Sequence, residues 1–248
     1  MKYLLLASGQ IVEQLLHNNW FLDEIKKNLC GLISTESIFD LYSKKTLINN
    51  ELPHYFICDK SINELQLEDL IKKTSPYYLL SIQYPWILPS KILDLVNGKV
   101  LNLHNAKLPN YRGHNTISHE ILNQEKLHTT SLHWVAEDVD RGAIVLEFHI
   151  EISSDDTALS LHKKSISSAV ALLKEFFNNL HSTNNLPTGK LITGDGVYYS
   201  KNIEKIKRIP DNSSVSDIYR YSRAFYYPPY EPAFFIHEGK KIYVTLEY

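Results

Sequence analysis

A near-continuous apolar run, YYLLSIQY at residues 77–84, constrains the fold more than any other feature of this sequence. A strand that is apolar along its length has no side to offer to water, so it belongs inside a sheet that is covered on both faces. Similar runs lie at 3–7, 30–35, 55–58 and 100–104, and apolar residues with helical spacing, such as Ile11, Leu15 and Trp20, lie between them. The alternation predicts an α/β fold with a Rossmann-like, mostly parallel sheet and helices on both faces.

The pattern changes after residue 128. Two strands, 129–136 and 143–152, follow each other without a helix and are predicted to pair as a hairpin across the loop 137–142. A long helix capped by Ser153–Asp156 comes next, with apolar positions at Leu159, Ile166, Val170, Leu173, Phe177 and Leu180. The polar stretch 182–189 predicts a boundary between a large domain, 1–184, and a small C-terminal domain with β-strands, 185–248, which ends in a strand at 241–248.

Charge and cysteine content exclude several classes of protein. The formal net charge is -2, whereas a nucleic-acid-binding surface needs a basic excess, so no nucleic-acid partner is expected. No apolar stretch approaches the roughly 18 residues of a membrane span, and two cysteines without a pairing pattern fit a reduced, cytoplasmic setting. His114 and His119 have no cysteine nearby to complete a ligand set, so no metal is expected.

The strand 100–104, VLNLH, ends in two polar residues that project from one face. Residues two apart on a strand point to the same side, so Asn102 and His104 are presented together while Leu101 and Leu103 face the other way. Histidine suits acid–base chemistry near neutral pH, and an asparagine amide can donate to a developing oxyanion. Alternatively, Asn102 caps a turn and His104 is an ordinary half-buried histidine.

A carboxylate in the predicted hairpin loop would complete this site. Asp140 precedes Arg141-Gly142, and its side chain could reach His104 and stabilise its charge. The plainer alternative is that Asp140 and Gly142 are only turn residues. His133 alternates with Leu132 and is expected only to face a neighbouring strand.

Three motifs, taken in order, resemble the N10-formyltetrahydrofolate-dependent formyltransferases over about residues 77–180. They are Asn-Leu-His at 102–104, Leu-Pro-Asn-Tyr-Arg-Gly at 108–113 and Asp-Arg-Gly at 140–142. The sequence departs from the family at 105–107, where Asn-Ala-Lys replaces the usual Pro-Ser-Leu, and this change resembles the branch that modifies nucleotide-linked amino sugars. The resemblance implies that Asn102 binds the formyl oxygen, that His104 handles the proton, and that Asp140 orients His104 and a water molecule.

The same resemblance implies an N-formyltransferase enzyme with N10-formyltetrahydrofolate as co-substrate. The acceptor would be the amine of a dTDP-linked sugar such as dTDP-4-amino-4,6-dideoxyglucose, for O-antigen and lipopolysaccharide synthesis, and the enzyme would be a homodimer. Two segments would hold the folate, largely through main-chain groups and apolar walls. Their residues are Gln83, Trp86, Ile87 and Leu88 on one side, and Val135, Ala136, Asp138 and Asp140 on the other.

A cluster of aromatic residues among prolines, at 225–230, offers flat faces on which a nucleotide base could stack. Basic residues could neutralise the diphosphate. The predicted substrate set is Lys107, Tyr111, Arg112, Arg223, Phe225, Tyr226 and Tyr230. Alternatively, the cluster is a small core or a dimer interface, and the sequence leaves the sugar and its base open.

Other activities fit parts of the sequence. A methionyl-tRNA formyltransferase would be longer and carry a basic C-terminal domain. A glycinamide ribonucleotide enzyme would not need residues 185–248. A non-catalytic module that binds nucleotide sugars would not need Asn102, His104 and Asp140 together.

Overall fold

The computed structural model describes residues 1–35, 55–57 and 64–247, and groups the chain into two compact units. The first unit consists of residues 1–104, 131–147 and 169–192, and the second unit consists of 105–130, 148–168 and 193–248. The predicted boundary after residue 184 lies inside the first unit, and the division into domains 1–184 and 185–248 stays a prediction. The end of the predicted strand 55–58, with Cys58, lies outside the described residues.

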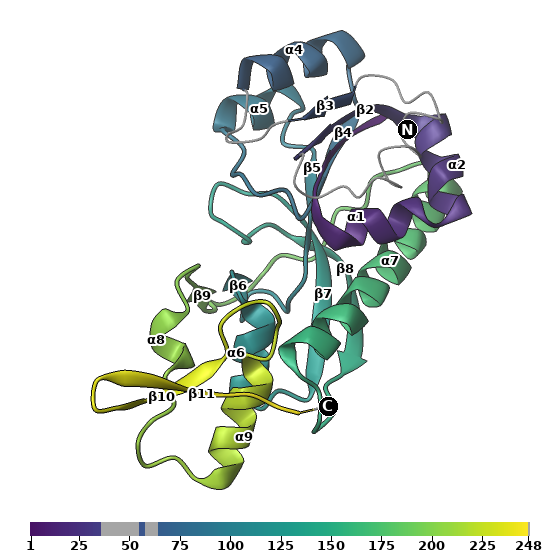
Figure 1. The fold of residues 1–248 in the computed structure, drawn as a ribbon. Helices are drawn as coiled ribbons and strands as arrows, with labels where there is room; N and C mark the ends of the chain where they lie inside the picture. The colour runs from purple at the N-terminus through teal and green to yellow at the C-terminus, as the bar shows by residue number, and fades with distance from the viewer. Residues whose placement is uncertain (36–54, 58–63, 248) are drawn as a thin grey trace. The chain divides into compact units, whose positions relative to one another are not determined.

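Within the described residues, seven strands form one sheet in the order β3-β2-β1-β4-β5-β7-β8 (Figure 1). Neighbours from β3 to β5 pair in parallel, and β5 pairs antiparallel with β7. The bounds are β1 Tyr3–Ala7, β2 Leu29–Ser34, β3 Tyr55–Ile57, β4 Tyr78–Ile82, β5 Val100–His104, β7 Leu127–Trp134 and β8 Ile144–Glu151. The predicted α/β, mostly parallel and Rossmann-like fold is confirmed, and β7 and β8 are sheet neighbours, as the predicted hairpin requires.

Helices cover both faces of the sheet in the first unit (Figure 1). On one face, α4 Glu64–Thr74 and α5 Ser90–Leu95 contribute Leu67 and Ile92 to an apolar cluster with Leu4 and Leu79 of the strands. On the other face lie α1 Gly9–Leu16, α2 Asn19–Asn28 and the C-terminal half of α7 Ala158–Thr183. There the ring of Phe177 packs 5.6 Å from that of Tyr3. In β1, Leu4 therefore packs into the core on one face of the sheet, and its neighbour Tyr3 packs into the core on the other face.

The helix predicted around residues 11–20 is two helices. The first ends at Leu16, and Asn18, with φ -105° and ψ 120°, leaves the helical conformation and begins α2. The side chain of Asn18 donates to the carbonyl oxygen of Gln14, 2.8 Å away. An asparagine that bonds locally to the backbone competes with helical hydrogen bonding, which explains the break.

The cap and the buried face of α7 also differ from the prediction. The capping residue is Thr157, whose hydroxyl accepts the Ser160 backbone N–H at 3.1 Å, while the Ser160 hydroxyl accepts the Thr157 N–H at 2.9 Å. Towards its N-terminal end, this helix buries Ser165 and Ser168. Three of the predicted apolar positions, Leu159, Ile166 and Val170, are consequently only half-buried, whereas Leu173, Phe177 and Leu180 are buried as predicted.

The second unit has a small core of its own. Its bounds are β6 Arg112–Gly113, α6 Thr116–Leu122, β9 Tyr198–Tyr199, α8 Glu204–Lys207, α9 Val215–Ala224, β10 Ala233–His237 and β11 Lys240–Val244. Strands β10 and β11 form an antiparallel pair, and the strand predicted at 241–248 is observed as β11, which ends at Val244. Ile121, Leu161 and Phe225 meet in its apolar cluster. In the part of the chain that the structure describes, no helix has the length and apolar character needed to cross a bilayer.

Candidate active site

The carboxyl end of β5 presents Asn102 and His104 on one face, as predicted. The alternating residues Leu101 and Leu103 are 0% and 4% exposed, so they anchor the strand in the core. Both polar side chains are half-buried. In open α/β sheets this end of a parallel strand is where ligands bind.

Asp140 reaches His104 from the loop between β7 and β8. Its Oδ2 lies 3.7 Å from His104 Nδ1, and both side chains are 11% exposed. The backbone of Asp140 has φ 56°, a left-handed conformation that aspartate and asparagine adopt more readily than most residues. The structure thus brings together in the first unit the amide, the imidazole and the carboxylate that the sequence pointed to.

A fourth residue, His133, lies in the same cluster and was not predicted to belong to it. It is 1% exposed and sits directly opposite Asn102 in the antiparallel register of β5 and β7. Its Nε2 lies 3.1 Å from Asn102 Nδ2 and 3.6 Å from Asp140 Oδ1, and its Nδ1 lies 2.8 Å from the Trp134 carbonyl oxygen. The register of β7 against β5 was the missing signal, because it decides which polar residue faces Asn102.

Burial governs the charge of His133. Removal from water, followed by repulsion from His104, lowers the pKa of His133 to about 4, although the Asp140 carboxylate acts in the opposite direction. His133 is therefore a neutral imidazole at neutral pH. A neutral ring has one N–H donor and one acceptor nitrogen, so its two contacts must be of opposite kinds.

Gly142 lets the Asp140 loop return to the sheet. A Cβ at this position would lie 1.6 Å from the Trp134 carbonyl oxygen, so no larger residue fits without moving the backbone. The Trp134 backbone N–H also donates to the Ala143 carbonyl oxygen at 2.9 Å. Gly142, which the plainer alternative treated as only a turn residue, thus sets how closely the loop packs against the backbone that contacts His133.

The two segments predicted to hold folate meet at one apolar cluster of the first unit. Trp86, Leu88 and Val135 are partly buried against it, and Trp86 packs edge-on to Tyr84 with ring centroids 5.2 Å apart. Two further members of the predicted set are exposed, Ile87 at 77% and Asp138, and Ala136 is half-buried. The structure therefore packs apolar side chains from both segments against the same cluster.

Gln83 has a structural contact that its predicted role did not include. Its side-chain oxygen accepts the Ile11 backbone N–H at 3.1 Å and so caps α1, whose first residue is Gly9. A Cβ at Gly9 would lie 2.4 Å from that oxygen. The amide oxygen of Gln83 thus already serves the N-terminus of a helix.

Three predicted substrate residues lie in the first part of the second unit. The Tyr111 hydroxyl donates to Glu125 at 2.7 Å, and burial raises the pKa of Tyr111. Arg112 donates to the Asp195 carbonyl oxygen at 3.1 Å and is half-buried, whereas Lys107 is exposed. Tyr111 is therefore a buried, hydrogen-bonded residue, and Lys107 is the side chain of the three most open to a ligand.

The aromatic cluster at 225–230 divides between core and surface. Phe225 is 4% exposed and belongs to the core of the second unit, which favours the alternative that this part of the cluster is a small core, and its contact with substrate stays a prediction. Tyr226 is half-buried and Tyr230 is 69% exposed. Arg223 donates to the Asp156 carbonyl oxygen at 2.8 Å.

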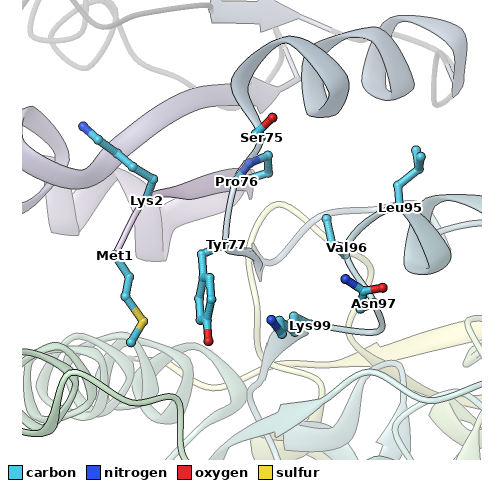
Figure 2. Close-up of a pocket in the computed structure, with 9 residues that line it drawn as sticks. All are labelled: Met1, Lys2, Ser75, Pro76, Tyr77, Leu95, Val96, Asn97 and Lys99. Atoms are coloured by element: carbon cyan, nitrogen blue, oxygen red, sulfur yellow. The ribbon is translucent and has the colours of Figure 1, made fainter.

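A cavity of about 430 Å³ lies at the amino ends of the central strands, opposite the end of β5 that carries Asn102 and His104 (Figure 2). Lys2, Tyr77 and Lys99, which line it, come directly before β1, β4 and β5, so the cavity sits at the amino ends of these parallel strands. The ammonium of Lys99 lies 4.1 Å from the centroid of the Tyr77 ring. None of the residues predicted for catalysis or folate binding lines this cavity.

Comparison with solved structures agrees on the fold. A 4-N formyltransferase from Francisella tularensis has a TM-score of 0.75 at 22% identity, over 99% of this chain and 97% of that one. An N-formyltransferase from Helicobacter canadensis, solved with folinic acid and dTDP-3-aminofucose, has a TM-score of 0.70 at 20% identity, over 98% and 86% of the two chains.

Sequence comparison identifies the family. GDP-perosamine N-formyltransferase of Brucella melitensis is 32% identical over 169 residues, which are 68% of this chain and 64% of that protein. The chain thus matches just under two thirds of that relative's length. A family model described as formyl transferase matches residues 38–175, more than half of the sequence. The chain therefore belongs to the formyl transferase family.

Proposed function

We propose that this protein transfers the formyl group of N10-formyltetrahydrofolate to the primary amine of a nucleotide-linked amino sugar. The observation that carries the proposal is the meeting of Asn102, His104 and Asp140 at the carboxyl end of β5. The family supplies the reaction class, and the names of the relatives from Brucella melitensis and Helicobacter canadensis support a sugar acceptor and a folate donor.

In the proposed reaction, the amine nitrogen attacks the formyl carbon while the carbonyl oxygen gains negative charge. Asn102 and His104 donate hydrogen bonds to that oxygen, the kind of stabilisation that acts mainly in the transition state. The bond from the formyl carbon to N10 then breaks, the amine loses a proton and N10 gains one. His104 carries that proton, and the products are the formamide of the sugar and tetrahydrofolate.

Asp140 stabilises the positive charge that His104 carries during proton transfer. The carboxylate and the imidazole are largely shielded from water, so their attraction is stronger than it would be at the surface. Trp86, Leu88 and Val135 form the apolar wall for the flat ring of the folate. Both parts of this proposal lie within the first unit.

For the acceptor, we propose a nucleoside-diphosphate-linked amino-deoxy sugar used in surface-polysaccharide synthesis. The sequence favours dTDP-4-amino-4,6-dideoxyglucose, and GDP-perosamine is the competing substrate because it is named for the Brucella melitensis relative. Lys107 and Tyr230, both exposed, are the residues of the predicted set best placed to meet a diphosphate and a base.

The test is a formylation assay with N10-formyltetrahydrofolate and a panel of dTDP-, UDP- and GDP-linked amino sugars. Formamide product is detected by mass spectrometry, and formation of tetrahydrofolate is followed by absorbance. We expect turnover with at least one amino sugar, loss of turnover in His104→Ala, and normal turnover in His114→Ala, which alters an exposed histidine of the second unit. Formylation of methionyl-tRNA alone, or of no acceptor, would contradict the proposal.

A further inference from the structure

We propose that His133 is a positioning residue of the formyl transfer: its unprotonated Nε2 accepts a hydrogen from the Asn102 side-chain amide and so aims that amide at the formyl oxygen. The inference rests on the proposed function and adds a residue to it. It is carried by two contacts made by opposite nitrogens of one buried ring.

The backbone decides which nitrogen of His133 carries the proton. Nδ1 lies 2.8 Å from the Trp134 carbonyl oxygen. A carbonyl oxygen only accepts hydrogen bonds, so Nδ1 is the donor. In a neutral imidazole the other nitrogen is then an acceptor, and Nε2 directs a lone pair towards Asn102.

That lone pair selects one of the two possible orientations of the Asn102 amide. With Nδ2 facing His133 at 3.1 Å, one hydrogen of the NH2 group is donated to Nε2. The flipped amide would place its oxygen against the lone pair, which is repulsive and leaves both groups without a donor. The second hydrogen of the same NH2 group remains to meet the formyl oxygen as negative charge develops there.

The neutral state of His133 also separates the roles of its neighbours. Asp140 Oδ1 lies 3.6 Å from Nε2, but an unprotonated nitrogen offers that carboxylate no hydrogen. The carboxylate therefore acts on His104, whose Nδ1 is 3.7 Å from Oδ2. Burial and the nearby His104 ring, at a centroid distance of 6.4 Å, keep the pKa of His133 low and preserve this division.

The first experiment compares two substitutions that differ in one acceptor. Methionine removes the acceptor from position 133, whereas the side-chain oxygen of glutamine can replace Nε2. We expect His133→Met to lower kcat by on the order of 100-fold, with KM for both substrates changed less than about threefold. We expect His133→Gln to keep kcat within about tenfold of the wild type.

A double-mutant cycle separates positioning from general stability. If His133 acts through Asn102, then His133→Met in an Asn102→Ala background lowers kcat by less than about threefold further. An equal loss in both backgrounds, or a His133→Met enzyme with kcat within about threefold of the wild type, would overturn the inference. If the wild type formylates no acceptor, that result refutes the proposed function itself, and the role of His133 in formyl transfer is refuted with it.

The second experiment does not depend on activity or on a variant that folds. Nitrogen-15 NMR of histidine-labelled full-length protein reports the protonation of each ring nitrogen. We expect His133 to be neutral and protonated at Nδ1 at pH 7. The opposite tautomer, or a charged ring at pH 7, would refute the proposed hydrogen bond from Asn102 whatever the kinetics show.

Discussion

Replacing Asp140 with asparagine removes one negative charge from the site and changes little else. Asparagine has nearly the same shape, and like aspartate it tolerates the left-handed backbone that Asp140 adopts at φ 56°. Glutamate would keep the charge but fits this backbone less well, so Asp140→Asn is the cleaner perturbation. We expect Asp140→Asn to fold normally and to lose activity.

The magnitude follows from the distance between the two groups. Asp140 Oδ2 lies 3.7 Å from His104 Nδ1, and at an effective dielectric constant of about 20 a pair of unit charges at this distance attracts by about 4 kcal/mol. If the transition state carries the full charge on His104, losing this attraction lowers kcat by on the order of 1,000-fold. Because both side chains are only 11% exposed, added salt should change the wild-type kcat little.

The assay is steady-state formyl transfer, with thermal unfolding measured on the same samples. The matched control is Glu137→Gln, which removes one charge from an exposed position of the same loop and should leave kcat within about twofold. An Asp140→Asn enzyme that retains a tenth or more of wild-type kcat would refute the electrostatic reasoning. So would an equal loss in Glu137→Gln.

The other predictions concern packing, acid stability and the folate. Gly142→Ala forces the Trp134 carbonyl oxygen to move, so the free energy of unfolding measured in urea should fall by about 1–3 kcal/mol; an unchanged midpoint contradicts the close contact. Asn105→Ala removes side-chain hydrogen bonds to two partners and should cost about 2 kcal/mol in the same assay. Burial lowers the pKa of His119 to about 4, so the unfolded chain binds its proton first as pH falls below about 6.5. The melting temperature should therefore drop between pH 7 and pH 5, and drop less in His119→Gln. Trp86→Ala should raise KM for the folate about tenfold with kcat nearly unchanged, and a fall in kcat alone would contradict its role as a wall.

The sheet was predictable because its signal is local. Strands β1 and β4 are apolar along nearly their whole length, a pattern that residue order alone reveals. The predicted ranges of β1 and β5 match the observed bounds, and the strand predicted at 77–84 is one residue shorter at its start and two residues shorter at its end. The ends of the helices were not predictable from the sequence, because they depend on competing hydrogen bonds. Asn18 ends one helix by bonding to the backbone, and Thr157 rather than an aspartate or serine upstream caps α7.

The residues of the candidate site that lie on one strand were predictable from the sequence. The residue that a second strand brings to the site was not. Asn102 and His104 share a face because strand geometry requires it. His133 was placed opposite Asn102 by the register of β5 and β7, which follows from tertiary packing and is not written in the sequence of either strand. The burial of Phe225 was not predictable for a related reason: the sequence pattern of an aromatic residue near prolines is the same whether the ring faces solvent or a core.

The division of the chain into two units affects how this protein can be engineered. The chain passes from one unit to the other after residues 104, 130, 147, 168 and 192, so no single cut separates them. Exchanging the tail of this protein for that of a relative would transplant only part of the second unit and leave 105–130 and 148–168 behind. A chimera that replaces the whole second unit must therefore exchange three segments together. Fragments released by a protease should unfold rather than persist as free modules.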